Sequence, residues 1–567
     1  MKVQSLCLAA LAALLFAGVR AEACSNVIVT RGASADGSCM VSYAADSHVL
    51  YGELYFHPAG RFRAGSKLDI IEWDTYKPLG QIHQIPRTYK TVGNMNEKQL
   101  IIGETTWGGR EEQVDTTGIM DYGSLIYITL QRAATARAAI DTIVSLANRY
   151  GYPSEGESFS IADKDEAWVM DLVGKGPDNR GIVWVARRIP DGYICAHANQ
   201  ARITSFPLND PENCLYAPDV ISYAREQGWF SGADEDFSFR DAYNPLDFGG
   251  ARACDARAWA ALRILCDGVF VYSDGGVEVS RPASDWTEYA LGHDITGEMP
   301  LFVKPSRKVT MKDVADVMRD HFEGTPLDMT QDIGAGGNAL PYRWRPMHFK
   351  WNGREYVNER AIATQQTGFW FVAQARGWLP DEVGALVWFG TDDAATSYLT
   401  PIYVSTSRVP ECLRVGNGDM LHYSPTSQFW ICNRIAQACY KMYNVMAPTV
   451  RCAADAFEQE QMFSAVPSFD ARVGKLVSRG RLRKARRLMT KYTVQTAQAQ
   501  FDKWVALEEL LLLKYLDGNI KAQNEDGSFV HSEYNAGTPS GITNQPYVEA
   551  WRKAVAESEH GKVLEVR

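Results

Sequence analysis

The sequence predicts a mixed α and β fold, with short strands in the first 190 residues and helices toward the C-terminus. Two observations predict it. Runs of β-branched and aromatic residues bounded by glycine, asparagine and aspartate recur before residue 190. The segment 472–516 is charged, free of proline and rich in helix formers. With 46% hydrophobic and 22% charged residues, the chain has the composition of a globular protein with an ample core.

The predicted strands begin with 26–30 and 39–44, which the polar turn 32–37 joins into a hairpin. Cys24 stands at the start of the first strand, and a strand end is a rigid place to hold a reactive group. Four further strands follow the same pattern, at 99–104, 158–162, 167–172 and 181–187.

Helical periodicity is found at 133–149, 311–322, 429–443 and 472–516. The segment 200–305 is rich in turn residues and aromatic residues and has no clean period. Because neither an internal repeat nor a low-complexity linker interrupts the chain, we expect one continuous domain over 24–460, with a largely helical extension over 461–567 packed on it.

The N-terminal segment 1–23 has the features of an export leader. Lys2 provides a positive start, an apolar run follows, and Ala21-Glu22-Ala23 forms a small-x-small cleavage site. Cleavage there exposes Cys24 as the first residue, in the periplasm or outside the cell. A bacterial lipoprotein is the alternative, since its mature chain also begins with cysteine, although Glu22 fits that signal poorly.

Charge and spacing exclude several classes of function. The formal net charge of −10 argues against a nucleic-acid partner, and after residue 23 no apolar stretch is long enough for stable membrane insertion. We predict no metal and no cofactor, because the chain lacks Cys-x-x-Cys and His-x-x-x-His spacing and a phosphate-binding loop. Ten cysteines follow the leader, and their pairing stays open, as does assembly into a homo-oligomer.

A cysteine at a free N-terminus combines a nucleophile and a base in one residue. The reference pKa values are about 8.5 for the thiol and about 7.7–8.0 for the amine, so near neutral pH the amine can take the thiol proton and later return it to a leaving group. Cys24 therefore needs no histidine. His197 is the alternative base, in a Cys/His dyad, but a structural role for it is the simpler interpretation.

Motifs along the chain resemble the secreted cysteine-nucleophile dipeptidases of the dipeptidase A type, relatives of bile-salt hydrolase and penicillin V acylase among the N-terminal-nucleophile hydrolases. The motifs that carry the resemblance are Cys24-Ser-Asn-Val-Ile-Val, Asp46-Ser47, Gly103-Glu-Thr-Thr106, Asn199-Gln-Ala-Arg-Ile203, Thr364-Gln-Gln-Thr-Gly368 and Trp388-Phe-Gly390. The resemblance implies a four-layer αββα sandwich and hydrolysis of dipeptides or other short peptides through a thioester.

Carried over residue by residue, the resemblance makes Cys24 the nucleophile and Asp46 the acid that holds its amine. Asn199 corresponds to the amide side chain of the oxyanion hole, and Thr105 to a second polar site residue. Thr105 and Asp46 would, without the resemblance, be ordinary strand-end residues.

A dipeptide also carries a free ammonium and a free carboxylate. Glu104 or Asp46 is the candidate for the ammonium, and an arginine suits the carboxylate, with Arg202 as the candidate. The acylase relatives usually carry an arginine three residues before the acid and another after a Ser-x-x-Ser element, where this chain has Tyr43 and Gln428. We therefore expect a raised thiol pKa unless Arg202 or Arg31 fills that space.

Two alternatives to a dipeptidase follow from the same residues. An acylase that cleaves another linear amide, such as an N-acyl amino acid, would use the same nucleophile. A lipid-anchored binding protein would carry an acyl group on Cys24 and would have no catalytic duty.

Overall fold

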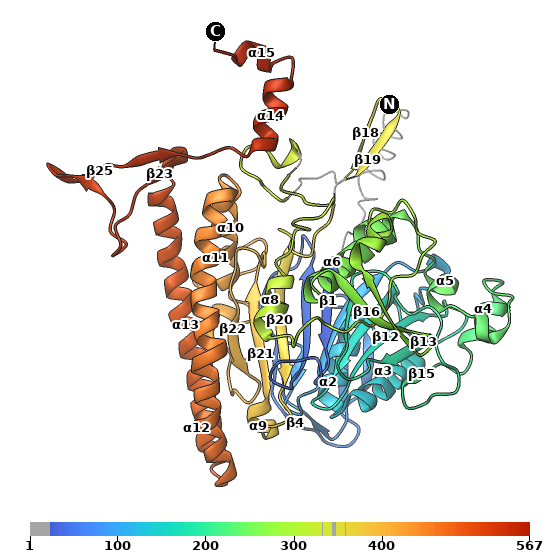
Figure 1. Cartoon of the computed structure of the whole chain (residues 1–567). Helices are drawn as coiled ribbons and strands as arrows, with labels where there is room; N and C mark the ends of the chain where they lie inside the picture. Colours follow the sequence, from blue (N-terminus) through green and yellow to red (C-terminus); the bar gives the residue numbers. More distant parts are fainter. Residues whose placement is uncertain (1–22, 332, 343–347, 358, 567) are drawn as a thin grey trace, which may run out of the picture.

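The computed structural model describes residues 23–331, 333–342, 348–357 and 359–566. Two antiparallel sheets form its centre (Figure 1). The first has six strands, in the order β14 (Ile194–His197), β1 (Ala23–Val29), β2 (Cys39–Asp46), β20 (Thr367–Ala375), β21 (Ala385–Thr391) and β22 (Thr400–Tyr403). The second has eight, in the order β15 (Cys214–Tyr216), β13 (Ile182–Arg188), β12 (Ala167–Gly174), β11 (Gly156–Ala162), β10 (Ile101–Trp107), β9 (Met95–Asn96), β8 (Thr91–Val92) and β3 (Phe56–His57).

The two sheets pack face to face through β1 and β2 on one side and β10 and β11 on the other. Alternation along β1 explains this packing, because Ile28 joins the core between the sheets while Val27 and Val29 join a second core beneath the helices. Strands covered on both faces are buried along their length, as all eight residues of β2 are.

Helices cover the outer faces of both sheets. On the eight-stranded sheet lie α2 (Tyr122–Arg132) and α3 (Ala136–Tyr150); on the six-stranded sheet lie α6 (Ala256–Leu265), α8 (Met311–Val317), α10 (Gln428–Cys439) and α13 (Leu482–Lys514). The remaining helices are α4 (Val220–Glu226), α5 (Phe239–Tyr243), α7 (Thr287–Ala290), α9 (Asp381–Gly384), α11 (Tyr443–Glu460), α12 (Val466–Ser478), α14 (Glu549–Glu557) and α15 (Gly561–Leu564). The mixed α and β class predicted from the sequence is confirmed.

Small two-stranded sheets project from this body. They are β4 (Gly60–Arg61) with β7 (Arg87–Thr88), β5 (Lys67–Ile71) with β6 (Pro78–His83), β16 (Val269–Asp274) with β17 (Val277–Pro282), β18 (His348–Trp351) with β19 (Arg354–Val357), β23 (Asn519–Lys521) with β26 (Ile542–Asn544), and β24 (His531–Ser532) with β25 (Asn535–Pro539). No helix among the described residues is both long and apolar enough to cross a membrane.

The predicted N-terminal hairpin is confirmed, since β1 pairs with β2, and the four predicted strands that follow are β10 to β13. The predicted helix 472–516 is two helices. Gly480, with φ of +70°, ends α12 and reverses the chain into α13, a conformation that glycine adopts without strain. The predicted helix 311–322 ends early, at Val317, and α11, which contains Pro448, was not predicted.

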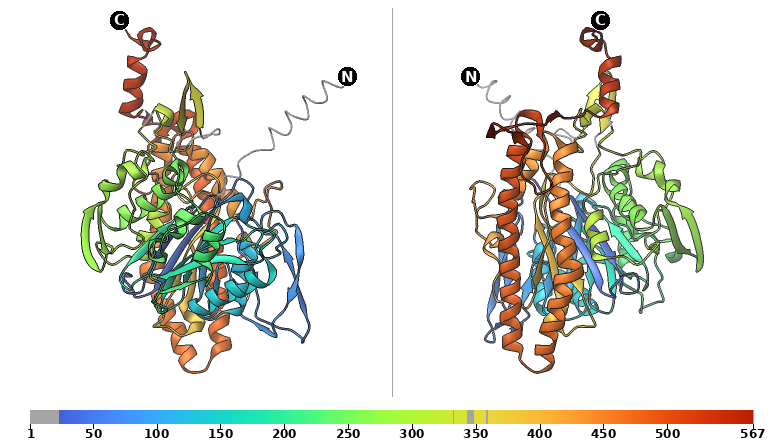
Figure 2. Two further views of the ribbon diagram at one scale, coloured as in Figure 1. Left: turned by 90° about the vertical axis from the view of Figure 1, so that its right-hand side faces the viewer. Right: turned by 60° about the vertical axis from the view of Figure 1, so that its left-hand side comes forward.

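The long helices α11, α12 and α13 stand along one side of the molecule, beside β21 and β22 (Figure 1), and come forward in the right-hand view of Figure 2. Beyond α13 the chain continues into β23 to β26 and α14 at one end of the molecule. The division at residue 460 stays a prediction. The leader 1–23 lies outside the described residues apart from Ala23.

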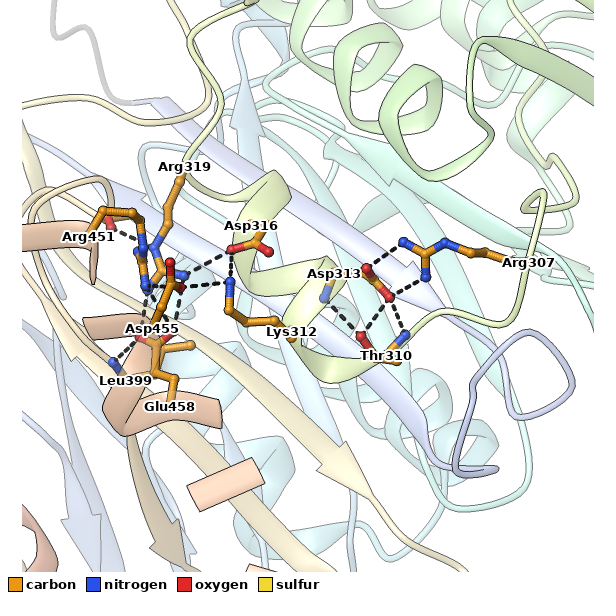
Figure 3. Close-up of polar contacts among 11 residues, drawn as sticks. Arg307, Thr310, Lys312, Asp313, Asp316, Arg319, Leu399, Arg451, Asp455 and Glu458 are labelled. Atoms are coloured by element: carbon orange, nitrogen blue, oxygen red, sulfur yellow. Dashed lines mark hydrogen bonds and ion pairs between the residues drawn. The ribbon is translucent and has the colours of Figure 1, made fainter. Parts of the chain in front are cut away.

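A buried ion network fixes α11 to the rest of the fold (Figure 3). Glu458 of α11 is fully buried and accepts hydrogen bonds from Arg319 at 2.6 Å, from Arg451 at 3.1 Å and from the backbone nitrogen of Leu399 at 3.0 Å. The Arg319 guanidinium also lies 4.8 Å from the centre of the Trp370 ring on β20. These contacts join the end of α8, the entry to β22 and α11 at one buried carboxylate.

Candidate active site

Cys24 lies near the start of β1, which stands between the edge strand β14 and β2 in the six-stranded sheet. It is 6% exposed and lines a cavity of about 670 Å³. Residues from β2 and the segment after it, from β10, from the start of α2 and from the loops 73–76 and 415–422 form the walls. The lining side chains include several tyrosines and the five carboxylates Asp46, Glu53, Asp74, Glu104 and Asp419.

The backbone of Cys24 is held on both sides of its Cα. Its nitrogen donates a hydrogen bond to Asn199 Oδ1 at 2.9 Å, and its carbonyl oxygen accepts one from Arg257 Nη1 at 2.7 Å. Arg257 Nη2 also donates to Asn199 Oδ1, at 2.8 Å, and Nη1 donates to Ser25 Oγ at 2.9 Å. Arg257 comes from α6, which packs on β1 and β14. The guanidinium thus ties β1 to the loop after β14.

The sulfur of Cys24 faces a tyrosine and a carboxylate. Sγ lies 3.7 Å from the hydroxyl of Tyr43 and 3.6 Å from Glu104 Oε1, and the Tyr43 hydroxyl donates to the same Glu104 oxygen. Burial, with the negative charges of Glu104 and Asp46, raises the pKa of the thiol well above its ordinary value. The resting thiol is therefore protonated at neutral pH, and an attack by sulfur requires a base to take that proton.

Asp46 ends β2 and pairs in register with Ala23, the residue before Cys24. Its Oδ1 accepts a hydrogen bond from Thr367 Oγ1 at 2.7 Å, whereas Oδ2 is buried and receives none from a described residue. Burial raises the pKa of Asp46 to about 7, opposed by Thr367 and by the charges of Arg360 and Arg257. A buried carboxylate oxygen without a donor is costly, so this site favours a cation beside it.

Asn199 lies two residues after β14 with φ of +55°, a left-handed conformation that asparagine tolerates better than most residues. Its side-chain oxygen faces Cys24 N and Arg257, and its Nδ2 donates to the backbone oxygen of Thr106 at 2.5 Å. The structure thus places Cys24, Asp46 and Glu104 in the lining of one cavity, and Asn199 in hydrogen-bonding contact with the backbone of Cys24.

Thr105 and His197 lie outside this group. The Thr105 hydroxyl bonds with His197 Nδ1 at 2.8 Å, and His197 Nε2 bonds with Ser160 Oγ at 2.7 Å. Both ring nitrogens are therefore occupied away from Cys24. Burial, with the charge of Arg202, lowers the pKa of His197 to about 3, so the ring is neutral. This arrangement fits a structural histidine, and Thr105 does not line the cavity.

Arg202 and Arg31 also lie away from the cavity lining. Arg202 is buried 3.7 Å from Asp255, and its guanidinium donates to the backbone oxygens of Ala196 and Pro300. Arg31 is exposed beside Asp165. Within the described part of the chain, the positive charges of Arg257 and Arg360 act on the group around Cys24 instead.

Sequence reasoning missed Arg257, Arg360 and a third residue, Glu157. Burial and the charge of Arg257 lower the pKa of Arg360 to about 10. The negative charges of Asp46 and Cys24 oppose this shift. Arg257 lies in the segment without clean periodicity, so only the packing of α6 on β1 identifies it. Glu157 is the one acidic residue of β11, a strand whose seven residues are all buried, and this was the available signal.

Comparison with known sequences gives one family. Residues 57–455 match the description "Peptidase family C69". A "Probable dipeptidase" of Salmonella dublin is 23% identical over 401 residues, which cover 67% of this chain and 81% of that protein. "Probable dipeptidase B" of Lactococcus lactis is 23% identical over 73% of this chain and 80% of that protein. "Dipeptidase A" of Lactobacillus helveticus is 22% identical over 77% of this chain and 85% of that protein.

Proposed function

Since this chain belongs to peptidase family C69, we propose that it is a cysteine peptidase that hydrolyses dipeptides, with Cys24 as its nucleophile once residues 1–23 have been removed. The observation that carries this proposal is the position of Cys24. Its nitrogen and its sulfur both lie at the base of a cavity beside two buried carboxylates, Asp46 and Glu104.

Removal of the leader converts the nitrogen of Cys24 from an amide into an amine. That nitrogen already lies 2.9 Å from Asn199 Oδ1. Loss of Ala23 opens the position opposite Asp46 in the β1–β2 register, where Asp46 Oδ2 has no donor. The amine would supply that donor, and the carboxylate would hold and polarise it. The support for cleavage itself is the leader pattern of the sequence, and with it we propose export to the periplasm or beyond the cell.

The proposed reaction proceeds in two stages. The neutral amine takes the proton of the Cys24 thiol as sulfur attacks the scissile carbonyl carbon, and an S–C bond forms. The C–N bond then breaks while the ammonium returns the proton to the leaving amine. Water, deprotonated by the same amine, attacks the thioester and releases the first amino acid with the restored thiol. The raised thiol pKa makes this base necessary.

The tetrahedral intermediate carries a negative oxygen, which needs donors at its position. Asn199 is the side chain nearest to the reacting nitrogen, and its Nδ2 has a second N–H besides the one donated to Thr106. We assign that N–H, with a backbone amide, to the oxyanion. Asn199 would then serve twice, with its oxygen holding the amine of Cys24 and its nitrogen stabilising the intermediate.

A free ammonium distinguishes a dipeptide from an N-acyl amino acid. The α-amine of a dipeptide is two bonds from the carbonyl that sulfur attacks, so its partner must lie close to Sγ. Glu104 Oε1, at 3.6 Å from Sγ, meets this requirement. An uncharged acyl group would leave a buried carboxylate unpaired at the same place, which is unfavourable. Glu104 therefore favours a dipeptidase over the alternative acylase.

The fold belongs to the same proposal. Helices on both outer faces of two packed sheets, with Cys24 near the start of β1, fit the four-layer sandwich of the N-terminal-nucleophile hydrolases. Lipidation of Cys24 is the remaining alternative, and a buried sulfur that lines a cavity speaks against it.

The test compares a set of dipeptides with the same dipeptides acetylated at the amine. We expect turnover of the free dipeptides only. The Cys24→Ala variant should be inactive, and Cys24→Ser should keep weak turnover, because a hydroxyl is a poorer nucleophile here. Preference for the acetylated substrates would favour the acylase, and full activity of Cys24→Ala would exclude the proposed nucleophile.

A further inference from the structure

A second carboxyl group lies behind Glu104 and takes no part in the reaction described above. Glu157 belongs to β11 and is fully buried. The antiparallel register pairs Thr106 of β10 with Glu157, and Glu104 is two residues before Thr106 on the same strand. Side chains two residues apart point to the same face of a sheet. Glu104 and Glu157 are therefore diagonal neighbours on one face.

Two hydroxyl groups, of Thr106 and Tyr152, donate to the carboxyl group of Glu157. Thr106 Oγ1 lies 3.2 Å from Oε1 and 3.1 Å from Oε2, and the Tyr152 hydroxyl donates to Oε2 at 3.3 Å. The Glu104 side chain, its diagonal neighbour on the same face, also lies within hydrogen-bonding reach of this carboxyl group. Glu104 Oε2 is also buried, and no amide, amine or hydroxyl group of the described residues donates to it. A protonated carboxyl group is the remaining kind of donor.

Two carboxylates in contact inside a protein do not both ionise near neutral pH, so the pair holds one proton. Burial and the charge of Glu104 raise the pKa of Glu157 well above its ordinary value, which places the proton on Glu157. A protonated Glu157 is a donor, and it supplies the hydrogen bond that Glu104 lacks. The titratable groups that face this pair are Cys24, Tyr43, Tyr127 and Tyr152, with Asp121 near Tyr152.

We propose that Glu157 is a positioning residue that stays neutral, donates to Glu104 and holds it as the single negative charge that receives the substrate ammonium. This inference rests on the proposed function, in which Glu104 binds that ammonium. It specifies a substrate with one free, protonated α-amine. A second negative charge in the pair would bind the cation more strongly but would also oppose formation of the Cys24 thiolate, 3.6 Å from Glu104.

The decisive comparison is between Glu157→Gln and Glu157→Ala. The glutamine amide reproduces the neutral acid, since its nitrogen donates to Glu104 and its oxygen accepts from Thr106 and Tyr152. We expect Glu157→Gln to keep the KM for a dipeptide within about twofold of the parent, and Glu157→Ala to raise it about tenfold with a smaller change in kcat. Equal losses in the two variants would overturn the proposal, because they would show that the charge of Glu157 is needed.

A second measurement does not depend on substrate. The rate of Cys24 alkylation is followed against pH by peptide mapping. A neutral Glu157 places no charge near the thiol, so the parent and Glu157→Gln should reach the alkylation midpoint at the same pH. A lower midpoint in Glu157→Gln would overturn the proposal, because it would show that Glu157 is ionised while the thiol titrates.

The matched control is Asp171→Asn, which removes another buried carboxyl group, from β12 of the same sheet. It should change the melting temperature without changing KM or the alkylation profile. If the parent cleaves no dipeptide, the proposed function fails, and the alkylation profiles still decide whether Glu157 is neutral.

Discussion

Asn199 Oδ1 accepts a hydrogen bond from the backbone nitrogen of Cys24 at 2.9 Å across 175 positions of sequence. The same oxygen accepts from Arg257 Nη2. The nitrogen that would become the catalytic base is thus positioned by a side chain from the loop after β14, and that side chain is oriented in turn by an arginine of α6.

Asn199 provides the first prediction. We expect Asn199→Ala to lower kcat about 10²- to 10³-fold, the usual loss for one oxyanion donor. Alanine is strained at the φ of +55°, so Asn199→Gly is the matched variant that removes the side chain without that strain. Both variants should lose activity equally although the glycine variant melts higher. Near-parent kcat in the glycine variant would exclude a catalytic role for the amide.

Arg360 provides a prediction about the thiol. Its positive charge interacts with Cys24 and opposes the burial, Glu104 and Asp46 that raise the thiol pKa. Arg360→Gln should therefore move the midpoint of Cys24 alkylation to higher pH, as read by mass spectrometry of the Cys24 peptide. Arg31→Gln removes an exposed cation away from the cavity lining and serves as the control, with an unchanged midpoint. Superimposable curves for all three proteins would remove Arg360 from the site.

Asp392 predicts how stability depends on pH. Burial raises its pKa to about 8 in the fold, against about 3.9 in an unfolded chain. Between these values the folded state binds more protons, so stability falls as pH rises from about 4 to about 8. Asp392→Asn should flatten this fall, and its melting temperature relative to the parent should increase steadily from about pH 4.5 to about pH 8.5. Asp69→Asn, at an exposed site, should leave the slope unchanged.

Glu458 predicts the contribution of the ion network in Figure 3. Glu458→Ala leaves the guanidinium of Arg319 buried without its carboxylate and should destabilise the fold by about 3–5 kcal/mol. Glu460→Ala on the same helix, where the side chain is exposed, should cost less than about 0.5 kcal/mol. Denaturant unfolding of the two variants checks this. A loss for Glu458→Ala no larger than for Glu460→Ala would contradict the importance of the network.

Local sequence patterns identified the elements whose signals are local. β1, β2 and β10 to β13 are short runs of strand-forming residues between turns, so they could be predicted. The region of α12 and α13 was predicted as one helix, because the turn at Gly480 was not recognised. α11 was missed because Pro448 interrupts a pattern that tertiary packing and the buried Glu458 restore.

The residues of the candidate site also fall into those that sequence motifs identify and those that only packing identifies. Cys24, Asp46, Glu104 and Asn199 lie in motifs that the family resemblance identifies. The fold brings the first three to one cavity and Asn199 to the backbone nitrogen of Cys24. Arg257, Arg360 and Glu157 reach the site only through packing of α6, a distant loop and the β10–β11 register. Arg202 seemed suited to a carboxylate by its motif, but burial beside Asp255 gives it a different set of contacts. Sequence distance contains no information on these neighbours.

The central claim is that the free amine of Cys24 is the catalytic base, and one preparation tests it. The chain is made with a removable segment before Cys24, and dipeptide hydrolysis and intact mass are measured together as that segment is cut away. The account predicts that activity appears in proportion to the species whose mass begins at an unmodified Cys24. Full activity before any cleavage would contradict it.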